Sequence, residues 1–268
     1  MGKYYYGNPE NSGAWEQTAS VFAGHDSVNS EKTSSLALVQ FWKPSKGRAK
    51  QFGEACGLAP EELLADVSSL CFEYPVPVSI TSGGKGKPSM TDLMIITEWH
   101  AIAVEAKWKE CREPYEPIGV WKNKDNQKNR ERVLNGWVGY IEDCGYPVNR
   151  EKIDDVAYQF LHRIASSCYV AKQKDRKPKV VYHLFYENND AGVKKFTDKL
   201  EQYYRDLFNE EARRVPFYII KQKVSVNIPQ GMSEIAASDK RAWNELFVWM
   251  QKKSVYTFLP IEVIYDSP

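Results

Sequence analysis

The chain of 268 residues lacks any apolar run close to the ~20 residues that a helix needs to cross a bilayer. Its first residues, MGKYYYGNPENSG, are polar and aromatic and lack the apolar region typical of a secretory signal. The sequence also shows no internal repeat. These absences argue against a membrane-spanning, secreted or repeat protein, and we expect a soluble cytoplasmic protein that does not bind a membrane.

Cysteine is scarce and spread out, and its number is odd. The five cysteines are Cys56, Cys71, Cys111, Cys144 and Cys168. None belongs to a CxxC pair, so neither a zinc ribbon nor a disulfide framework is indicated. Reduced thiols are typical of the cytoplasm. The four histidines have no HExxH spacing, and no G-x-S-x-G elbow supports acyl hydrolase chemistry.

Excess charge is also missing, because the formal net charge is only +1. A nucleic-acid-binding protein therefore needs local basic patches here. The cluster Lys172, Lys174, Arg176, Lys177 and Lys179 is one such patch, although a charge run of this kind usually marks a solvated loop. The segment TSGGKGKPS, residues 81–89, does not follow the order of a phosphate-binding P-loop. Its Lys85 and Lys87 still fit contacts with a phosphate backbone.

Hydrophobic residues make up 43% of the chain, which is enough for one large packed domain. We expect an irregular N-terminal arm over residues 1–29 and a single domain over 30–268. Periodicity and caps predict helices over 30–42 (with Ser30 as N-cap), 60–70, 126–142, 153–171, 192–213 and 238–253. Strands are expected over 71–80, on both sides of residues 98–100, and over 180–187, 215–228 and 258–266; residues 43–57 and 110–126 read as connections. This order predicts a mixed α/β fold, a central mixed sheet flanked by helices.

The most informative stretch is TDLMIITEWHAIAVEAKWK, residues 91–109. It reads as two apolar strands that carry Asp92, Glu105 and Lys107, although charged residues are rarely buried without partners. Glu105 and Lys107 are two residues apart, so in a strand they point to the same face. An even number of loop residues would place Asp92 across from Glu105 or Lys107, whereas an odd number would need a bulge.

Two neighbouring carboxylates repel each other unless a cation neutralises them. Oxygen ligands favour Mg²⁺, Mn²⁺ or Ca²⁺, and the carboxylates of Asp92 and Glu105 with the carbonyl of Ala106 are suitable donors. Lys107 could then orient or deprotonate an attacking water, or offset charge in the transition state of a phosphate ester. The alternative is an acid at a strand start with an ordinary Glu–Lys pair at a sheet edge.

The arrangement resembles the PD-(D/E)XK nuclease superfamily, also called restriction endonuclease-like. Its motif is an acid at the start of one strand, then Glu or Asp, any residue and Lys on the next strand; Asp92, Glu105 and Lys107 match it. Thr91 stands where the motif has proline. The resemblance covers a core of about residues 30–190, with C-terminal helices and strands added over 191–268. It implies Mg²⁺-dependent hydrolysis of nucleic-acid phosphodiesters.

The resemblance also implies a glutamate upstream of the first motif strand. Glu73 is the first choice, and Glu31 and Glu62 are alternatives. A glutamine on the helix after the lysine strand is a further expected site residue, and Gln127 fits that place. The sequence is equally compatible with Glu73 as an ordinary half-exposed strand residue and with Gln127 as a solvated residue at a helix start.

The sequence therefore predicts a Mg²⁺-dependent endonuclease, with Mn²⁺ as an alternative cofactor and DNA as substrate, RNA remaining open. Basic residues near the site, namely Lys85, Lys87, Lys109 and Arg130, are candidates for contacts with the nucleic acid. One alternative is a non-catalytic module with the same fold that binds nucleic acid or a protein. A weaker one is a metal-dependent hydrolase of small phosphate esters. Homodimerisation is compatible with cutting both strands.

Overall fold

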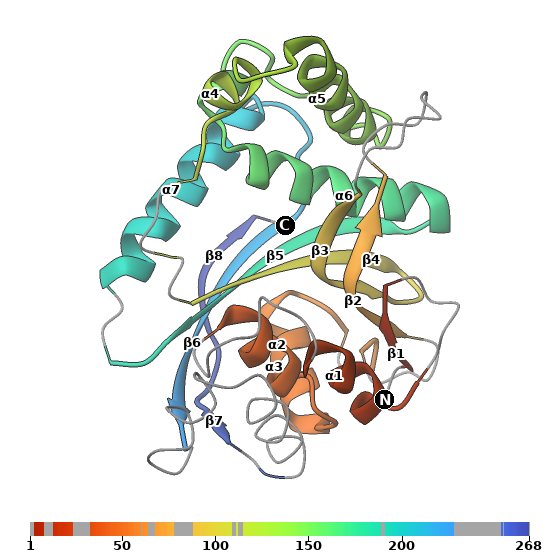
Figure 1. The fold of residues 1–268 in the computed structure, drawn as a ribbon, viewed down its shortest axis with the longest axis vertical. Helices are drawn as coiled ribbons and strands as arrows, with labels where there is room; N and C mark the ends of the chain where they lie inside the picture. The colour runs from red at the N-terminus through yellow and green to blue at the C-terminus, as the bar shows by residue number, and fades with distance from the viewer. Residues whose placement is uncertain are drawn as a thin grey trace.

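A mixed β-sheet separates two layers of helices (Figure 1). The computed structural model describes residues 3–7, 13–23, 33–59, 61–63, 68–77, 88–108, 111, 115–188, 191–227, 253 and 255–267. The strands, in their order across the sheet, are β1 (Lys3–Tyr6), β2 (Ser69–Val76), β3 (Ser89–Ile96), β4 (His100–Lys107), β5 (Lys177–Tyr186), β6 (Phe217–Val226) and β7 (Tyr256–Phe258). An eighth strand, β8 (Glu262–Ser267), also pairs with β6. The predicted α/β class with a central mixed sheet is confirmed.

Strand direction changes across the sheet. β2, β3 and β4 form an antiparallel meander, whereas β4, β5 and β6 run parallel to one another. Parallel neighbours need crossover connections, and the chain supplies helices between β4 and β5 and between β5 and β6. Both faces of β4 are therefore covered, which explains why six consecutive residues, 101–106, are buried.

The helices divide between the two faces of the sheet (Figure 1). One layer contains α1 (Trp15–Ala23), α2 (Ser34–Phe41) and α3 (Lys46–Ala55). The other layer contains α4 (Ile118–Lys122), α5 (Gln127–Glu142), the 3₁₀ turn η2 (Ile153–Asp155), α6 (Tyr158–Lys174) and α7 (Ala191–Leu207). Each layer packs on one face of the sheet, so there are two hydrophobic clusters. Among the described residues no helix is both long enough and apolar enough to cross a membrane.

The irregular arm predicted over residues 1–29 is wrong for its described parts, residues 3–7 and 13–23. β1 joins the sheet in parallel with β2, and α1 packs on the same face as α2. Trp15 is buried, and its indole Nε1 donates a hydrogen bond to the carbonyl of Val39 at 3.1 Å. A strand of four residues and one short helix give little periodic signal, so long-range packing determines this segment.

The connection predicted over residues 43–57 is also wrong, because α3 occupies most of it. Ser45 caps this helix by accepting a hydrogen bond from the backbone N–H of Arg48 at 3.4 Å. Gly57 follows the helix with a φ of +61°, a conformation that glycine adopts easily. Glycines and lysines obscured the helical spacing of the buried residues Ala49, Phe52 and Cys56.

Several boundaries differ from the sequence predictions. The N-cap of α2 is Thr33 rather than Ser30, and β2 begins at Ser69, inside the helix predicted over 60–70. α4 lies within the predicted loop 110–126, and α7 ends at Leu207 rather than residue 213. The helix predicted over 238–253 lies outside the described residues, save for Lys253. These errors are expected where propensity alone sets an end.

Candidate active site

Two neighbouring strands bring Asp92 and Glu105 together. Leu93 of β3 pairs with Val104 of β4, so Asp92 stands at the next position, across from Glu105. The turn between the paired residues Ile96 and Ala101 contains residues 97–100, an even number. The carboxylate of Asp92 reaches β4 directly, because its Oδ2 accepts a hydrogen bond from the backbone N–H of Ala106 at 2.9 Å. The predicted cross-strand juxtaposition is confirmed.

Glu105 and Lys107 point to the face of the sheet that α6 covers. Lys107 Nζ lies 2.7 Å from Glu105 Oε1, and this lysine side chain is 13% exposed. Ala101 and Ala103 belong to the hydrophobic cluster on this face, whereas Ile102 belongs to the cluster on the opposite face. The alternation predicted for β4 is therefore confirmed, and small alanines leave room beneath the charged groups.

Arg163 of α6 completes the charged group from above the sheet. Its Nη2 forms an ion pair with Glu105 Oε2 and lies 3.8 Å from Asp92 Oδ1. Its Nη1 donates a hydrogen bond to the carbonyl of Met90 at 3.1 Å. The sequence pattern did not single out this residue. A signal was present, because an arginine stands between Leu161 and Ile164, two residues assigned to the buried face of the helix.

The two carboxyl groups have opposite electrostatic environments. Burial raises the pKa of Asp92 to about 7, and the charge of Glu105 adds to this rise. Burial also pushes the pKa of Glu105 upward, but Arg163 and Lys107 outweigh that effect and lower it to about 2. Glu105 is therefore a fixed anion, whereas Asp92 titrates near neutral pH. Carboxyl groups with diverging pKa values are typical of functional sites.

Lys107 remains protonated under ordinary conditions. Burial lowers its pKa, but the charges of Glu105 and Asp92 outweigh burial and raise the pKa above its ordinary value. A lysine of this kind is a poor base but a stable source of positive charge. Of the roles expected from the sequence, the arrangement favours orientation and charge compensation over removal of a proton.

Glu73 of β2 lies beside the acid pair. It occupies the position of β2 opposite Asp92, between the pairs Phe72–Leu93 and Tyr74–Thr91. Burial raises the pKa of Glu73, and its charge in turn contributes to the raised pKa of Asp92. Its φ of +48° is unusual for a residue with a side chain. Such a conformation changes where the side chain points, and non-glycine residues with it often mark functional sites.

Two phenol hydroxyls near the acids have no hydrogen-bond partner within the described part of the chain. They belong to Tyr115 and to Tyr182, a fully buried residue of β5 that pairs with Glu105. Burial raises the pKa of both phenols, and Glu105 raises it further. Lys107 Nζ also lies 5.7 Å from the centre of the Tyr115 ring. Buried hydroxyls usually have partners, so a buried phenol without one lowers the stability of the fold.

The other residues predicted for the site have different fates. Gln127 is the exposed first residue of α5 and makes no contact with the acids among the described residues, so its role stays a prediction. Arg130 stacks on Trp121 at 4.9 Å. Glu62 is excluded as the upstream acid, because it binds His100 at the opposite end of β4, with Oε1 2.6 Å from Nδ1. Glu31, Lys85, Lys87 and Lys109 lie outside the described residues.

The two acids carry the oxygen donors that hard divalent cations prefer. Asp92 and Glu105 supply carboxylate oxygens. The backbone of Ala106 is close to the first of these acids, because its N–H donates a hydrogen bond to the Asp92 carboxylate. Mg²⁺ typically takes one or two carboxylates and completes its shell with water and substrate phosphate. No cluster of three or more His, Cys, Asp or Glu suited to a metal occurs in the described ranges, so further ligands would be waters, the Ala106 carbonyl and substrate.

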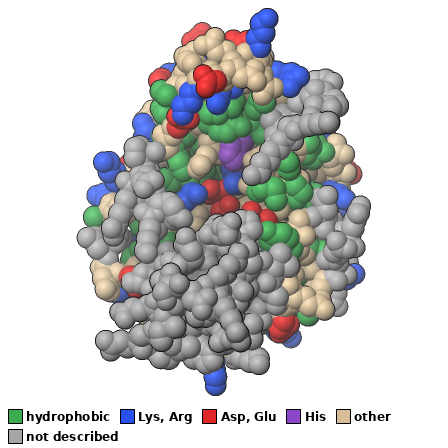
Figure 2. Space-filling model, viewed as in Figure 1, with side chains coloured by type: hydrophobic (Ala, Val, Ile, Leu, Met, Phe, Trp, Pro, Cys, Tyr) green, Lys and Arg blue, Asp and Glu red, His purple; other side chains and the backbone are tan. Residues whose placement is uncertain are grey.

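The site can be reached from solvent on the side of Asp92. The Asp92 side chain is 23% exposed, whereas those of Glu105 and Arg163 expose 5% and 3%. Figure 2 shows acidic side chains at the bottom of a hollow near the middle of one face of the molecule, with basic and hydrophobic side chains around it. A ligand would therefore meet Asp92 before Glu105, with Arg163 behind both.

Comparisons with known proteins add a family to this geometry. No curated protein and no solved structure matches the chain. A family model described as "Domain of unknown function (DUF6946)" matches residues 11–224. The match includes all four charged residues, Asp92, Glu105, Lys107 and Arg163, and leaves out β1, β7 and β8. Since the model covers well over half of the sequence, the chain belongs to the DUF6946 family.

Proposed function

We propose that the protein is a metal-dependent endonuclease that hydrolyses phosphodiester bonds in DNA. One observation carries the proposal: Asp92 and Glu105 meet across β3 and β4, with the ammonium of Lys107 2.7 Å from Glu105. Two acids and a lysine on adjacent strands are the arrangement of the restriction endonuclease-like nucleases. The mixed sheet with helices on both faces is compatible with that fold.

Each residue has a distinct part in the proposed reaction. Asp92, Glu105 and the Ala106 carbonyl would hold Mg²⁺ or Mn²⁺, and the bound metal would supply Lewis-acid chemistry at the phosphate. Lys107 offsets the negative charge that develops on the phosphate oxygens. Glu73 adds a third acid beside Asp92. Arg163 holds Glu105 in position through their ion pair.

A nicking assay on supercoiled plasmid tests the proposal. The wild-type protein should convert the plasmid to open circles with Mg²⁺ or Mn²⁺ and not with a chelator. Asp92→Asn and Glu105→Gln should each lower the rate by about a hundredfold or more, because each removes a ligand charge. Lys107→Met should also lower the rate, because it removes charge from the transition state.

Asp175→Asn is a matched control for these variants. Asp175 and Lys177 repeat the acid-x-Lys spacing at the junction of α6 and β5, and asparagine tolerates the left-handed backbone of position 175 (φ +53°). This variant should cut at the wild-type rate. If the wild type cuts neither duplex nor single-stranded DNA nor RNA with either metal, the enzymatic proposal is overturned.

A non-catalytic module is the second candidate, and one observation favours it. Both carboxylate oxygens of Glu105 are already paired, one with Lys107 and the other with Arg163. A site whose inner acid is neutralised by the protein's own cations has less need of a metal. Calorimetric titration with Mn²⁺ separates the two functions. The nuclease should bind Mn²⁺ at a site lost in Asp92→Asn, whereas the module should show no such site.

The proposed cellular setting follows from the cysteines. Cys56, Cys71, Cys111, Cys144 and Cys168 are all free thiols. Free thiols persist in reducing compartments, so we propose a cytoplasmic location. Of the four basic residues predicted to contact nucleic acid, Arg130 is the one that the structure describes. We propose that it contacts the phosphate backbone of the substrate. Light scattering with and without DNA would show whether cutting involves a homodimer.

A further inference from the structure

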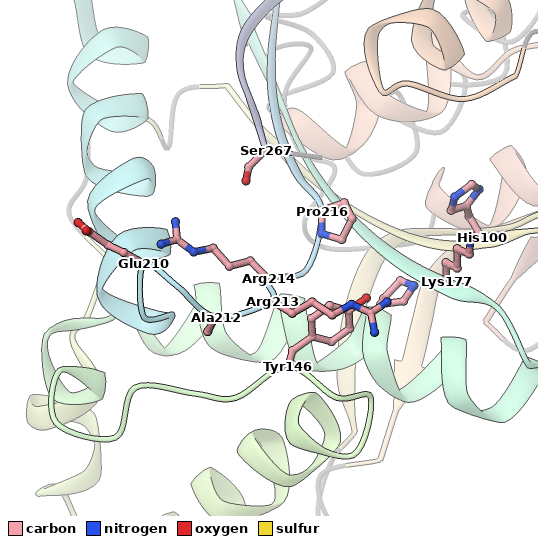
Figure 3. Close-up of a pocket in the computed structure, with 10 residues that line it drawn as sticks. His100, Tyr146, Lys177, Glu210, Ala212, Arg213, Arg214, Pro216 and Ser267 are labelled. Atoms are coloured by element: carbon pink, nitrogen blue, oxygen red, sulfur yellow. The ribbon is translucent and has the colours of Figure 1, made fainter.

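A second charged recess lies at the opposite end of the parallel strands. Its cavity of about 580 Å³ opens where β4, β5 and β6 begin. The lining residues are His100, Tyr146, Lys177, Pro178, Glu210, Ala212, Arg213, Arg214, Pro216 and Ser267 (Figure 3). We call this cavity the basic pocket. Ligand sites typically enclose about 300–1,000 Å³, so the basic pocket has room for a small ligand.

Positive charge dominates the basic pocket. Lys177, Arg213 and Arg214 supply three cations, and Glu210 is the one acid of the lining. This excess contrasts with the whole chain, in which 36 basic residues balance 35 acidic ones. Figure 3 shows that the two arginines extend in opposite directions, Arg213 across Tyr146 and Arg214 toward Glu210. Arg213 therefore extends away from the one acid of the lining.

Arg213 is held in place before any ligand arrives. Its guanidinium stacks on the ring of Tyr146, 4.9 Å from the centroid. The guanidinium also donates a hydrogen bond to the Tyr146 hydroxyl, so ring and hydroxyl together orient it, and its remaining N–H groups can bind an anion. Arg214 is anchored as well, because its Nε and Nη2 donate to the carbonyl of Asn209 at 3.2 and 3.1 Å.

Lys177 differs from three of the other four members of the basic run in which it stands. Lys172 pairs with Asp143, Arg176 Nε donates to the carbonyl of Thr97, and Lys179 Nζ donates to that of Cys56. Within the described residues no acid or carbonyl binds the ammonium of Lys177. The solvated run that the sequence predicts as the ordinary explanation holds for the exposed Lys172 and Lys174, whereas Lys179 is buried and Lys177 lines the basic pocket.

The basic pocket is separate from the acid site. His100, at the start of β4, lines the basic pocket, and Lys107, at the end of the same strand, belongs to the acid site. At 3.3 Å per residue the two ends of this strand are roughly 23 Å apart. The ring of His100 is held by Glu62, so this residue forms a wall.

We propose that the basic pocket binds a phosphate group, gripped by Lys177 and Arg213. An arginine with a fixed plane favours anions that accept two parallel hydrogen bonds, and a nearby lysine adds a point charge. Phosphate has this geometry, and the cavity leaves space for the group to which it is attached. The attached group would be a nucleoside or a nucleic-acid strand. Free phosphate, which has no attached group, is the third source of the same chemistry.

Binding measurements with three probes test the proposal, all in EDTA so that no metal contributes. Calorimetry is used for inorganic phosphate and for ATP, and fluorescence anisotropy for a labelled single-stranded DNA oligonucleotide with a terminal phosphate. At least one probe should bind the wild type. The double variant Lys177→Glu with Arg213→Glu should weaken that binding by about tenfold or more, because two charge-assisted contacts become repulsive.

The double variant Lys194→Glu with Lys195→Glu is the matched control. Both lysines are exposed on α7, and the change in net charge is the same. This control should bind each probe like the wild type. Asp92→Asn should also bind the probes like the wild type in EDTA, since the acid site is not part of the basic pocket. If the protein shows no nicking activity but still binds a probe, the proposed nuclease function fails and the basic pocket does not.

The probe with the highest affinity identifies the source of the phosphate. Preference for the oligonucleotide indicates a nucleic-acid strand, preference for ATP a nucleotide, and equal affinity for all three the phosphate alone. The proposal is overturned if the wild type binds none of the probes. It is also overturned if the control variant loses binding as strongly as the pocket variant, because overall charge would then explain the effect.

Discussion

Arg163 of α6 and Glu105 of β4 form an ion pair in which the exposed fraction of neither side chain is above 5%. The pair fastens a helix to the central strand of the sheet. Arg163 also binds the carbonyl of Met90 on β3, so one guanidinium bridges both strands of the candidate site. Burying two charges is costly, and removing one partner leaves the other uncompensated. The stability of the fold and the shape of the acid site therefore depend on the same contact.

Arg163→Met should destabilise the protein by about 3 kcal/mol, because the buried carboxylate of Glu105 loses one of its two cationic partners. Lys107 remains as the other partner and limits the loss. Urea denaturation followed by circular dichroism measures the change in the free energy of unfolding. Lys172→Met is the matched control, because Lys172 and Asp143 form an exposed ion pair. Its effect should stay below about 1 kcal/mol. Equal losses in the two variants would contradict a special role for Arg163.

Asp92→Asn should stabilise the protein at alkaline pH. The pKa of Asp92 rises from 3.8 to about 7 on folding. The folded state therefore holds the proton more tightly, and this contribution to stability is present below pH 3.8 and lost as pH rises through 7. Asparagine cannot ionise and avoids that loss.

The difference in unfolding free energy between Asp92→Asn and wild type should favour the variant by on the order of 2 kcal/mol above the folded pKa and shrink toward acidic pH. Urea titrations on both sides of that pKa, in a chelator, provide the measurement. A difference that stays constant with pH would show that Asp92 does not titrate with a raised pKa.

Tyr182→Phe should leave stability unchanged or raise it by about 1 kcal/mol, because the lost hydroxyl has no partner among the described residues. Tyr204→Phe is the comparison. Tyr204 is also fully buried, but its hydroxyl donates to the carbonyl of Val215 at 2.8 Å. That variant should lose about 1 kcal/mol. Thermal unfolding of the pair measures both effects.

The same tyrosine variants connect packing with the proposed chemistry. If the hydroxyl of Tyr182 holds a water or a substrate oxygen beside Glu105, Tyr182→Phe should lower the plasmid nicking rate by about tenfold, whereas Tyr204→Phe should not. A wild-type rate in Tyr182→Phe would mean that this hydroxyl serves neither purpose.

The sequence predicted the parts of the site that follow from local geometry. Strand period two is sufficient to put Glu105 and Lys107 on one face, and an even turn after Ile96 is sufficient to put Asp92 opposite Glu105. The mixed sheet also followed from the order of strands and helices. These features depend on a few neighbouring residues, so one sequence can specify them.

Arg163 could not be assigned in the same way. It lies far along the chain from Asp92 and reaches the acids only because α6 crosses above β4. Spacing along a helix does not show which charged residue will face a buried carboxylate. The N-terminal segment escaped prediction for a related reason, since β1 and α1 are short and depend on partners distant in sequence.

Trp15 provides the test of that N-terminal assignment. It is 1% exposed, packs in the cluster of α2 and α3, and donates a hydrogen bond to the carbonyl of Val39. Trp15→Ala should therefore cost about 3 kcal/mol or more of unfolding free energy, because it opens a large cavity and leaves a carbonyl without its partner. Trp99→Ala is the control, since Trp99 is 58% exposed, and it should change stability by less than about 0.5 kcal/mol. An irregular arm that does not pack would make the two tryptophan variants equally stable in urea denaturation.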